Sequence, residues 1–550
     1  MTTTETAMKT NPGTTKFKIL AADKLAKQGL EFIQSQADAE LVNKPGLSED
    51  ELAGIVGEHD AMIVRSGVTV TAKVLENHGR LKVIARAGVG VDNIDLEAAT
   101  AKGILVVNTA EANTLTTAEH AFALMLALAR NVGPAYKTMN DGGWDRSKFQ
   151  GRQLAGKTLG IVGFGRIGRA LAERALAFEM NVVAYDPFFN AETALDGRVK
   201  MFKSFTDMLP ECDVASFHVP LNDQTRSMLG KETWKLAKPG LMVVNAARGG
   251  VIDEDDIIPA IEAGQCGGAA LDVFTDEPPA ADHPLRKHPK VLVTPHLGAS
   301  TVEAQQAVSL DAAASVLMYL RGDGVKGAVN AAGLRLDLSP IQQRFADLAQ
   351  RMTTLIGPML TGGIGDVSFE CSGQELGSAA DALLRITLAD LLNQNLSVPV
   401  NLVNVMLVAE QRGITAKSVK HEEGKFGPQL TIEVQGTNGE SRRIVGRIYD
   451  DLKPRVIEIN GYHMDMIPAG DMVIVQNQDK PGIIGMVGNE FGEATVNIAD
   501  MSISRRQTKE GATALMVLKT DAEAPDSLID RMRARPGILK VAKVKLPAEG

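Results

Sequence analysis

The chain has 550 residues, of which 44% are hydrophobic and 23% are charged, and its formal net charge is −9. This length predicts three or four domains, and the composition is that of an ordinary water-soluble globular protein. The negative charge argues against a surface for nucleic acid, and no apolar run approaches the roughly 18–20 residues of a membrane span. We therefore expect a cytoplasmic protein that binds neither nucleic acid nor membrane.

The N-terminal segment and the cysteines carry no chemistry of their own. Residues 1–16 lack an apolar core and contain no arginine, which predicts a disordered tail rather than a signal or transit peptide. Cys212, Cys266 and Cys371 are scattered without the spacing of a metal site. We expect them to be buried, reduced thiols in a reducing compartment, and we expect no bound metal.

Residues 17–116 alternate short apolar strands with helices, which predicts a parallel sheet with helices on its faces. A later apolar helix over 301–320 can cross back to this sheet, so the domain is expected to be completed by residues 301–330. The expected strands are 17–21, 61–64, 83–85 and 105–108. Arg65 and Arg86 follow two of these strands beside glycines, where parallel sheets hold ligands. They are either an anion site or solvated surface residues.

Residues 117–300 begin with a long apolar helix over 117–129 and a polar loop over 136–153. Trp144 in that loop is either an anchor for local packing or part of an arm that packs on another subunit. The strands expected after the loop are 158–162, 181–185, 213–218, 241–245, 269–273 and 291–294. Six such strands predict a complete doubly wound sheet.

One stretch of this domain (TLGIVGFGRIGRALAERALA) has the pattern of a strand, a glycine turn and a helix. Apolar residues predict a buried strand over 158–162 and, at helical spacing, a helix over 166–177. Gly163, Gly165 and Gly168 form a G-x-G-x-x-G turn between them. Glycine turns are also common as plain structural turns. In this setting the turn aims backbone N–H groups and the helix dipole at one point, which favours a pyrophosphate.

The next apolar run ends at Asp186, which is placed to accept hydrogen bonds from an adenosine ribose. The residues that follow, Pro187, Phe188 and Phe189, offer no base to neutralise a ribose 2′-phosphate. The sequence therefore predicts NAD rather than NADP as the cofactor.

Arg248, Glu277 and His296 lie just past three successive predicted strands. Neighbouring parallel strands bring their ends together, so the three side chains can converge on the cofactor. A histidine can take the proton of an alcohol, a carboxylate can orient the histidine, and an arginine can hold a carboxylate substrate with two hydrogen bonds. Alone, His296 could be a surface residue, Glu277 could cap the following Pro-Pro turn, and Arg248 could be solvated. Together they predict alcohol oxidation by hydride transfer.

These motifs resemble, in order, those of the D-isomer-specific 2-hydroxyacid dehydrogenases. The matching segments are the glycine turn with Asp186, NAARG at 245–249, DVFTDEP at 272–278 and PHLGAST at 295–301. The resemblance implies Arg248 as the carboxylate binder, Glu277 as the orienting acid and His296 as the acid and base. It also implies NAD contacts at Val89, Gly163, Gly165, Arg166, Ile167, Gly168, Asp186, Val219, Ala246, Asp272, His296, Gly298 and Ala299. Some members carry threonine at the place of Val89, where only a backbone contact would survive.

Within that family, RAGVGVDNID at 86–95, Arg65-Ser66 and GRQLAGKT at 151–158 resemble members that oxidise 3-phospho-D-glycerate to 3-phosphohydroxypyruvate. That reaction is the first step of L-serine biosynthesis, and the resemblance covers residues 17–330 closely. It implies that Arg65 and Arg86 bind the phosphate or carboxylate of the substrate. Two alternatives are another 2-hydroxyacid dehydrogenase, such as a glyoxylate or hydroxypyruvate reductase, and an NAD-sensing binding protein or co-repressor. The former are usually shorter, and an intact triad favours an enzyme over the latter.

Residues 331–470 hold apolar helices and a predicted hairpin around Thr437-Asn438-Gly439. They resemble the intervening domain of the longer family members, which is thought to bind an anionic effector or substrate. The alternative is a spacer that supports structure and oligomerisation.

Residues 471–550 read strand, helix, strand, strand, helix, strand, which is a ferredoxin-like order. They resemble an ACT regulatory domain, which commonly binds an amino acid across a dimer interface. The resemblance implies an L-serine effector at Asn477, Asp479 and Asn497, and a homodimer or homotetramer. Serine-sensitive members often carry His and Asn where this chain has Asn477 and Asp479.

The expected fold is α/β, with two Rossmann-like or flavodoxin-like parallel-sheet domains, an α+β intervening domain and a ferredoxin-like ACT domain. The expected boundaries are 1–16 for the tail, 17–116 with 301–330 for the substrate-binding domain, 117–300 for the NAD domain, 331–470 for the intervening domain and 471–550 for the ACT domain.

Overall fold

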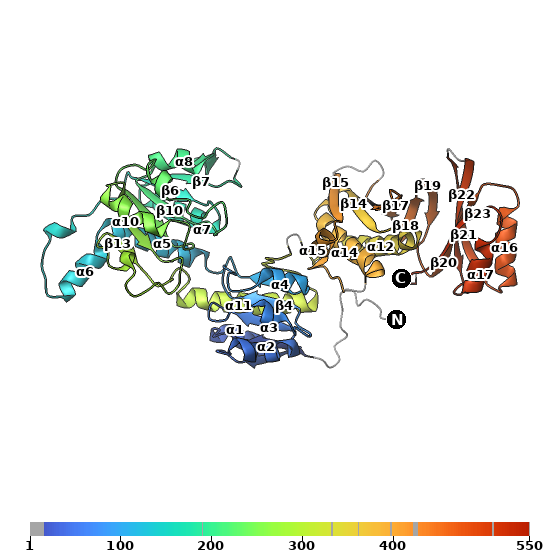
Figure 1. Ribbon diagram of the computed structural model, residues 1–550, viewed down its shortest axis with the longest axis horizontal. Coiled ribbons are helices and arrows are strands. Elements are labelled where there is room, and N and C mark those ends of the chain that lie inside the picture. The colour runs from blue at the N-terminus through green and yellow to red at the C-terminus, as the bar shows by residue number, and fades with distance from the viewer. Residues whose placement is uncertain are drawn as a thin grey trace.

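The computed structural model describes residues 16–189, 191–331, 334–360, 362–396, 399–421, 427–508 and 511–548. The predicted tail, apart from Lys16, lies outside the described residues. Two parallel α/β units are followed by two mixed α+β units, so the predicted fold class is confirmed (Figure 1). In Figure 1 the second sheet lies at one end of the elongated chain and the fourth sheet lies at the other.

The first sheet is parallel, with the strand order β2-β1-β3-β4-β5. Its strands are β1 (Phe17–Ala21), β2 (Ala39–Asn43), β3 (Ala61–Val64), β4 (Val83–Arg86) and β5 (Leu105–Asn108). Successive side chains point to opposite faces, and both faces are buried. Ile19 packs on one face beneath α1 (Lys27–Gln34) and α11 (Val302–Arg321). Leu20 packs on the other face beneath α2 (Glu49–Ile55), α3 (Ala72–Leu75) and α4 (Leu96–Ala101).

Side-chain caps mark the starts of two of these helices. Ser48 and Glu51 form a capping box at the start of α2, with each side chain bonded to the other's backbone N–H. Helix α11 begins after Thr301, whose side chain accepts from Ala304 N–H, and it packs on the first sheet although it follows the second in the chain.

The second sheet has the strand order β13-β12-β11-β10-β6-β7-β9-β8. Its strands are β6 (Thr158–Val162), β7 (Asn181–Tyr185), β8 (Thr193–Ala194), β9 (Val199–Phe202), β10 (Val214–Phe217), β11 (Leu241–Asn245), β12 (Cys266–Leu271) and β13 (Val291–Val293). Helices α5 (Thr114–Ala129) and α7 (Arg166–Ala177) cover one face. Helices α8 (Phe205–Met208), α9 (Lys231–Trp234) and α10 (Glu254–Glu262) cover the other.

Three expectations for this unit were wrong in detail. The six expected strands are present, but β9 pairs with β7 and β8 pairs with β9, which gives eight. The expected polar loop over 136–153 begins inside a helix, α6 (Val132–Asn140), which projects from the unit in Figure 1. Trp144 has 77% of its surface exposed, which contradicts a role in local packing.

The third sheet has the order β15-β14-β16-β17-β18-β19. It consists of β14 (Ile364–Ser372), β15 (Thr415–His421), β16 (Gln429–Gly436), β17 (Ser441–Ile448), β18 (Pro454–Ile459) and β19 (Tyr462–Met466). Its helices are α12 (Pro340–Ile356), α13 (Gln374–Gly377), α14 (Ala380–Asn395) and α15 (Val405–Gln411). The predicted hairpin is β16 and β17. Helix α15 starts only at Val405 because Asn401 and Asn404 hold the preceding turn with side-chain hydrogen bonds.

The fourth sheet is antiparallel, with the order β21-β22-β20-β23. Its strands are β20 (Asp471–Gln478), β21 (Ile498–Thr508), β22 (Gly511–Thr520) and β23 (Ile538–Lys545). Helices α16 (Ile483–Glu493) and α17 (Asp526–Arg533) pack on one face. Ile474 and Val517 on the other face join the core of the third unit. This arrangement is the ferredoxin-like order that the sequence predicts.

Polar contacts tie the units to each other. The Asn401 amide donates to the Gly103 carbonyl at 2.9 Å, which joins the third unit to the first. Arg351 on α12 is buried and donates to the carbonyls of Pro468 and Pro547, which joins the third unit to the fourth.

The three cysteines are free and buried, as the sequence predicts. Burial raises the pKa of the Cys212 and Cys371 thiols to about 12 and that of Cys266 to about 11. In the part of the chain that the structure describes, no helix has the length and apolar character needed to cross a membrane.

Candidate active site

The glycine turn between β6 and α7 requires glycine at two of its three positions. Gly163 has φ +92°, and a Cβ there would lie 2.6 Å from the His218 carbonyl oxygen. A Cβ on Gly168 would lie 2.2 Å from the Gly163 carbonyl oxygen. Gly165 is the N-cap of α7 and provides no side-chain cap. The first N–H groups of α7 are thus available to an anion.

Asp186 is oriented toward this turn. One oxygen of its carboxylate accepts from Phe164 N–H in the turn, and the other accepts from Phe188 N–H, each at 2.9 Å. These bonds hold the carboxylate at the end of β7, where a ribose would lie if its pyrophosphate bound at α7.

The other predicted cofactor residues come from several segments of both α/β units. Val219 is beside Gly163, since a Cβ on that glycine would be 2.9 Å from a Val219 methyl. Arg166 is paired with Glu111 at 2.9 Å, the half-buried Ile167 packs against the core, and Ala246 is buried. The Val89 carbonyl accepts from the Asn108 amide, and the Ala299 carbonyl accepts from the Gln305 amide.

Asp272 organises the loop that carries His296. Its side chain is fully buried, and its carboxylate accepts from the N–H groups of Leu297 and Gly298 at 2.7 and 2.8 Å. It also accepts from the Thr294 hydroxyl at 2.6 Å and from His120 Nε2 at 3.0 Å. Burial alone would raise the pKa of Asp272, but the hydrogen bonds that it accepts outweigh burial and lower that pKa.

The same loop holds His296 in an uncommon backbone conformation. Its φ is +54°, in the left-handed region that non-glycine residues rarely adopt. The His296 N–H also donates to the backbone carbonyl of Asp272 at 2.8 Å, so both the backbone and the side chain of Asp272 hold this loop. The contacts of Asp272 therefore stabilise a conformation that His296 would not adopt by itself.

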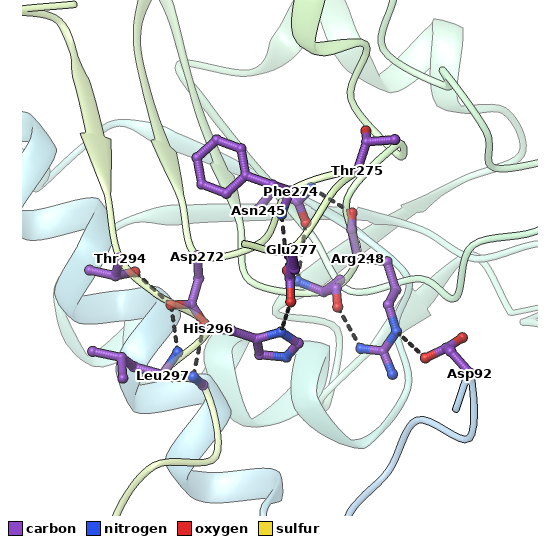
Figure 2. A network of polar contacts seen from close by, with 12 residues as sticks. Asp92, Asn245, Arg248, Asp272, Phe274, Thr275, Glu277, Thr294, His296 and Leu297 are labelled. Carbon is purple, nitrogen blue, oxygen red and sulfur yellow. Dashed lines mark hydrogen bonds and ion pairs between the residues drawn. The ribbon is translucent and has the colours of Figure 1, made fainter. Parts of the chain in front are cut away.

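His296 and Glu277 form the predicted pair. His296 Nδ1 lies 2.7 Å from Glu277 Oε2, and Phe274 N–H donates to the other carboxylate oxygen at 3.0 Å (Figure 2). Burial would raise the pKa of Glu277, but the hydrogen bonds from His296 and Phe274 outweigh it and lower that pKa. Glu277 is therefore ionised at neutral pH, and because a carboxylate only accepts, the His296 tautomer carries its proton on Nδ1.

Arg248 follows β11, and a local turn fixes its backbone. The buried Asn245 amide donates to the Arg248 carbonyl at 2.8 Å, and its oxygen accepts from Ala247 N–H. The Arg248 guanidinium donates from Nη1 to the Ala247 carbonyl at 2.6 Å and from Nε to Asp92 at 3.0 Å. Figure 2 shows Asp92 reaching Arg248 from a different segment of the chain.

The guanidiniums of Arg86 and Arg248 lie against the same turn, at residues 88–90. A Cβ on Gly88 would be 1.4 Å from Arg86 Nη1, and a Cβ on Gly90 would be 1.7 Å from Arg248 Nη2. Burial lowers the pKa of Arg86 to about 10, aided by the charges of Arg248 and Arg65. Arg86 Nε is buried without a hydrogen-bond partner among the described residues. The structure thus brings the three predicted arginines together as a cationic cluster.

Three residues that no sequence motif assigned support the site. Asp92 lies inside the RAGVGVDNID segment, and its place in that segment was the only sequence feature that could have pointed to it. His120 reaches Asp272 from α5. Glu254 on α10 accepts from the N–H and the hydroxyl of Thr275, each at 2.6 Å, which holds the loop before Glu277.

The residues present fit an NAD molecule. The uncapped start of α7 suits a pyrophosphate, the oriented carboxylate of Asp186 suits a ribose, and the His296 loop lies at the ends of β12 and β13 in the same sheet. No group of three His, Cys, Asp or Glu side chains in the described ranges could hold a metal ion.

The predicted effector residues lie in the fourth unit, far along the chain from this site. Asn477 is buried, and its Oδ1 has no hydrogen-bond partner among the described residues. Asp479 accepts from Arg505 Nε at 2.7 Å, and Asn497 donates to Asp521 at 2.6 Å. Asp479 is thus paired with a cation on β21.

Three protein-family models match the chain. They are "D-isomer specific 2-hydroxyacid dehydrogenase, NAD binding domain" over residues 122–298, "D-3-phosphoglycerate dehydrogenase intervening domain" over 342–460 and "ACT domain" over 472–537. Among curated proteins, D-3-phosphoglycerate dehydrogenase of Archaeoglobus fulgidus is 38% identical over 96% of this chain and 100% of its own length. The Bacillus subtilis enzyme of that name is 36% identical over 96% of this chain and 100% of its own.

Solved structures match a little over half of the chain. The TT0316 protein of Thermus thermophilus is 34% identical, with a TM-score of 0.52, over 57% of this chain and 100% of its own. A glyoxylate reductase from Paecilomyes thermophila is 28% identical, with a TM-score of 0.53, over 57% of this chain and 98% of its own. An NAD-dependent formate dehydrogenase from Staphylococcus aureus, in complex with NAD, is 28% identical, with a TM-score of 0.51, over 57% and 99%.

Proposed function

The chain belongs to the D-3-phosphoglycerate dehydrogenases of the D-isomer-specific 2-hydroxyacid dehydrogenase family, and on that premise we propose how its residues carry out the reaction. It oxidises 3-phospho-D-glycerate to 3-phosphohydroxypyruvate with NAD, the first step of L-serine biosynthesis. The observation that supports our assignment of roles is the contact between His296 Nδ1 and Glu277. It leaves Nε2 as the basic nitrogen.

His296 is the general base. Its Nδ1–H donates to Glu277, so Nε2 takes the proton of the C2 hydroxyl while C2 is oxidised. Glu277, ionised at neutral pH, stabilises the imidazolium that forms and keeps the ring oriented. When bound, NAD supplies the acceptor for the hydride. In the reverse direction the imidazolium returns the proton to the oxygen on C2.

The arginine cluster holds the two anionic groups of the substrate. Arg248 binds the carboxylate next to C2, since it lies at the end of β11 near the His296 loop. Arg86 and Arg65 bind the phosphate, and the unpartnered Nε of Arg86 is one donor for it. A dianionic phosphate also offsets the mutual repulsion of the guanidiniums, which adds to burial in lowering the pKa of Arg86.

Arg248→Lys tests this assignment. Lysine keeps the charge but loses the two-pronged donor geometry, so we expect KM for 3-phosphoglycerate to rise about 10- to 100-fold, which corresponds to roughly 1–3 kcal/mol. Steady-state kinetics with NAD saturating measure the change. Arg198→Lys is the matched control, because Arg198 bonds only to the nearby Leu195 carbonyl among the described residues. An unchanged KM in Arg248→Lys would remove Arg248 from the substrate site.

A glyoxylate or hydroxypyruvate reductase was the alternative within the family. The glyoxylate reductase structure matches 57% of this chain, whereas the D-3-phosphoglycerate dehydrogenases match 96% of it, including the intervening and ACT units. The longer match favours phosphoglycerate oxidation.

L-Serine is the proposed effector of the ACT domain. The buried Oδ1 of Asn477 lacks a donor, and the Asp479–Arg505 pair offers both charges that a zwitterion needs. We expect L-serine to release or absorb heat on titration into the full-length protein, and Asp479→Ala to abolish the signal. D-Serine is the matched ligand control. Absence of heat at millimolar L-serine would reject serine as the effector.

The remaining assignments concern assembly. We propose a cytoplasmic homodimer or homotetramer, in which the exposed Tyr136 and Met139 of α6 and Trp144 after it pack on another subunit.

We also propose domain boundaries at 17–116 with 301–330, 117–300, 331–470 and 471–550, which place each sheet in its own unit.

A further inference from the structure

Arg248 is held by a carboxylate from the other α/β unit. Asp92 lies between β4 and α4 of the first unit, whereas Arg248 follows β11 of the second. Arg248 Nε donates to Asp92 Oδ2 at 3.0 Å, as Figure 2 shows. The Asp92 side chain is 75% exposed and the Arg248 side chain is 28% exposed. An ion pair whose acid is this exposed adds little to the free energy of unfolding, so we look for its effect in the orientation of Arg248.

The contacts of Arg248 determine which of its donors stay available. A guanidinium carries five N–H donors. Within the described residues, Nε has Asp92 as its acceptor and Nη1 has the Ala247 carbonyl. Nη2 lies against Gly90, where the missing Cβ leaves room for it. Asp92 therefore engages the Nε side and leaves N–H bonds on Nη1 and Nη2 for a ligand.

The charges around Arg248 explain why an acid is needed there. Burial lowers the pKa of Arg86 and the charges of Arg248 and Arg65 lower it further, while the charges of Asp92 and Asp23 act in the opposite direction. Like charges at short range push guanidiniums apart. Asp23 accepts from the backbone N–H groups of residues 24, 65 and 67, so its oxygens are used in holding the loop of Arg65. Asp92 is the acid that bonds directly to a guanidinium of the cluster.

We propose that Asp92 is a positioning residue, which holds Arg248 by Nε so that the Nη donors face the substrate carboxylate. The inference rests on the proposed role of Arg248. The competing arrangement is that Asp92 occupies the place of the substrate carboxylate and must be displaced. The two arrangements predict opposite changes in KM when the charge of Asp92 is removed.

Asp92→Asn is the decisive variant, because it keeps the size of the side chain and removes its charge. If Asp92 positions Arg248, KM for 3-phosphoglycerate rises about tenfold, with kcat and KM for NAD within about twofold. Asp92→Glu, which keeps the charge, recovers part of the loss. Glu97→Gln is the matched control, since Glu97 is an exposed acid at the start of α4. An unchanged or lowered KM in Asp92→Asn would overturn the inference.

A double-mutant cycle with Arg248→Lys separates this inference from the assignment on which it rests. If Asp92 acts through Arg248, Asp92→Asn changes KM by less than about twofold in the Arg248→Lys background. The same tenfold change in both backgrounds would show that Asp92 acts elsewhere and would overturn the inference. An effect of Arg248→Lys alone, with none from Asp92→Asn, leaves the role of Arg248 intact. No effect of Arg248→Lys overturns both.

Discussion

Replacing His296 by Asn is expected to lower kcat for 3-phosphoglycerate oxidation by about 10²- to 10⁴-fold, the usual contribution of a general base. The Asn amide can still donate to Glu277 from the position of Nδ1, but it has no basic nitrogen in the position of Nε2. Steady-state kinetics measure the loss. His288→Asn is the matched control, since His288 is a histidine of the same unit whose Nδ1 accepts from the Lys290 N–H. Retention of more than about a tenth of kcat would exclude His296 as the base.

Asp272→Ala is expected to be the second most damaging substitution. It leaves the N–H groups of Leu297 and Gly298, with two side-chain donors, without their buried acceptor, and each lost partner costs about 1–3 kcal/mol. We expect the free energy of unfolding to fall by roughly 4 kcal/mol or more and kcat/KM to fall about 100-fold or more, because the His296 loop loses its support.

Thermal unfolding and kinetics together check this second prediction. Asp213→Ala is the matched control, because Asp213 accepts from Thr158 N–H and Lys238 at the opposite end of the strands, where the strands of the same sheet begin. Asp213→Ala should lose stability but keep kcat/KM at a temperature where it is folded. If Asp272→Ala kept wild-type kcat/KM under those conditions, the loop would not depend on Asp272.

Much of the fold could be predicted from local pattern. The periodicity of apolar residues predicted four of the five strands of the first sheet and six of the eight strands of the second. Side-chain caps at Ser48 and Thr301 mark the starts of α2 and α11. The misses were short or polar elements. Strand β9 is only four residues long, and its pairing with β7 rather than its own pattern makes it a strand. Helix α6 has no buried residue, so it carries no amphipathic signal for a core.

Some residues of the candidate site could be predicted from the sequence, and others became visible only in the structure. Strand-end position and residue type were sufficient to single out Arg248, Glu277 and His296, because parallel topology gathers strand ends at one edge. Asp272 was expected as a cofactor contact, whereas the structure shows its buried carboxylate holding the loop of His296. His120 supports that carboxylate from α5, and no spacing rule connects the two positions.

By itself, the sequence determined the candidates for the chemistry: a turn suited to a pyrophosphate, an acid suited to a ribose, and an arginine, a glutamate and a histidine at successive strand ends. These depend on local backbone geometry and residue type, which neighbouring residues encode. Only the tertiary structure decided which ring nitrogen of His296 carries the proton, through the 2.7 Å contact between Nδ1 and Glu277. It also decided which acid bonds to Arg248, namely Asp92 of the other unit. Such contacts join residues far apart in the chain, and their geometry exists only once the units pack.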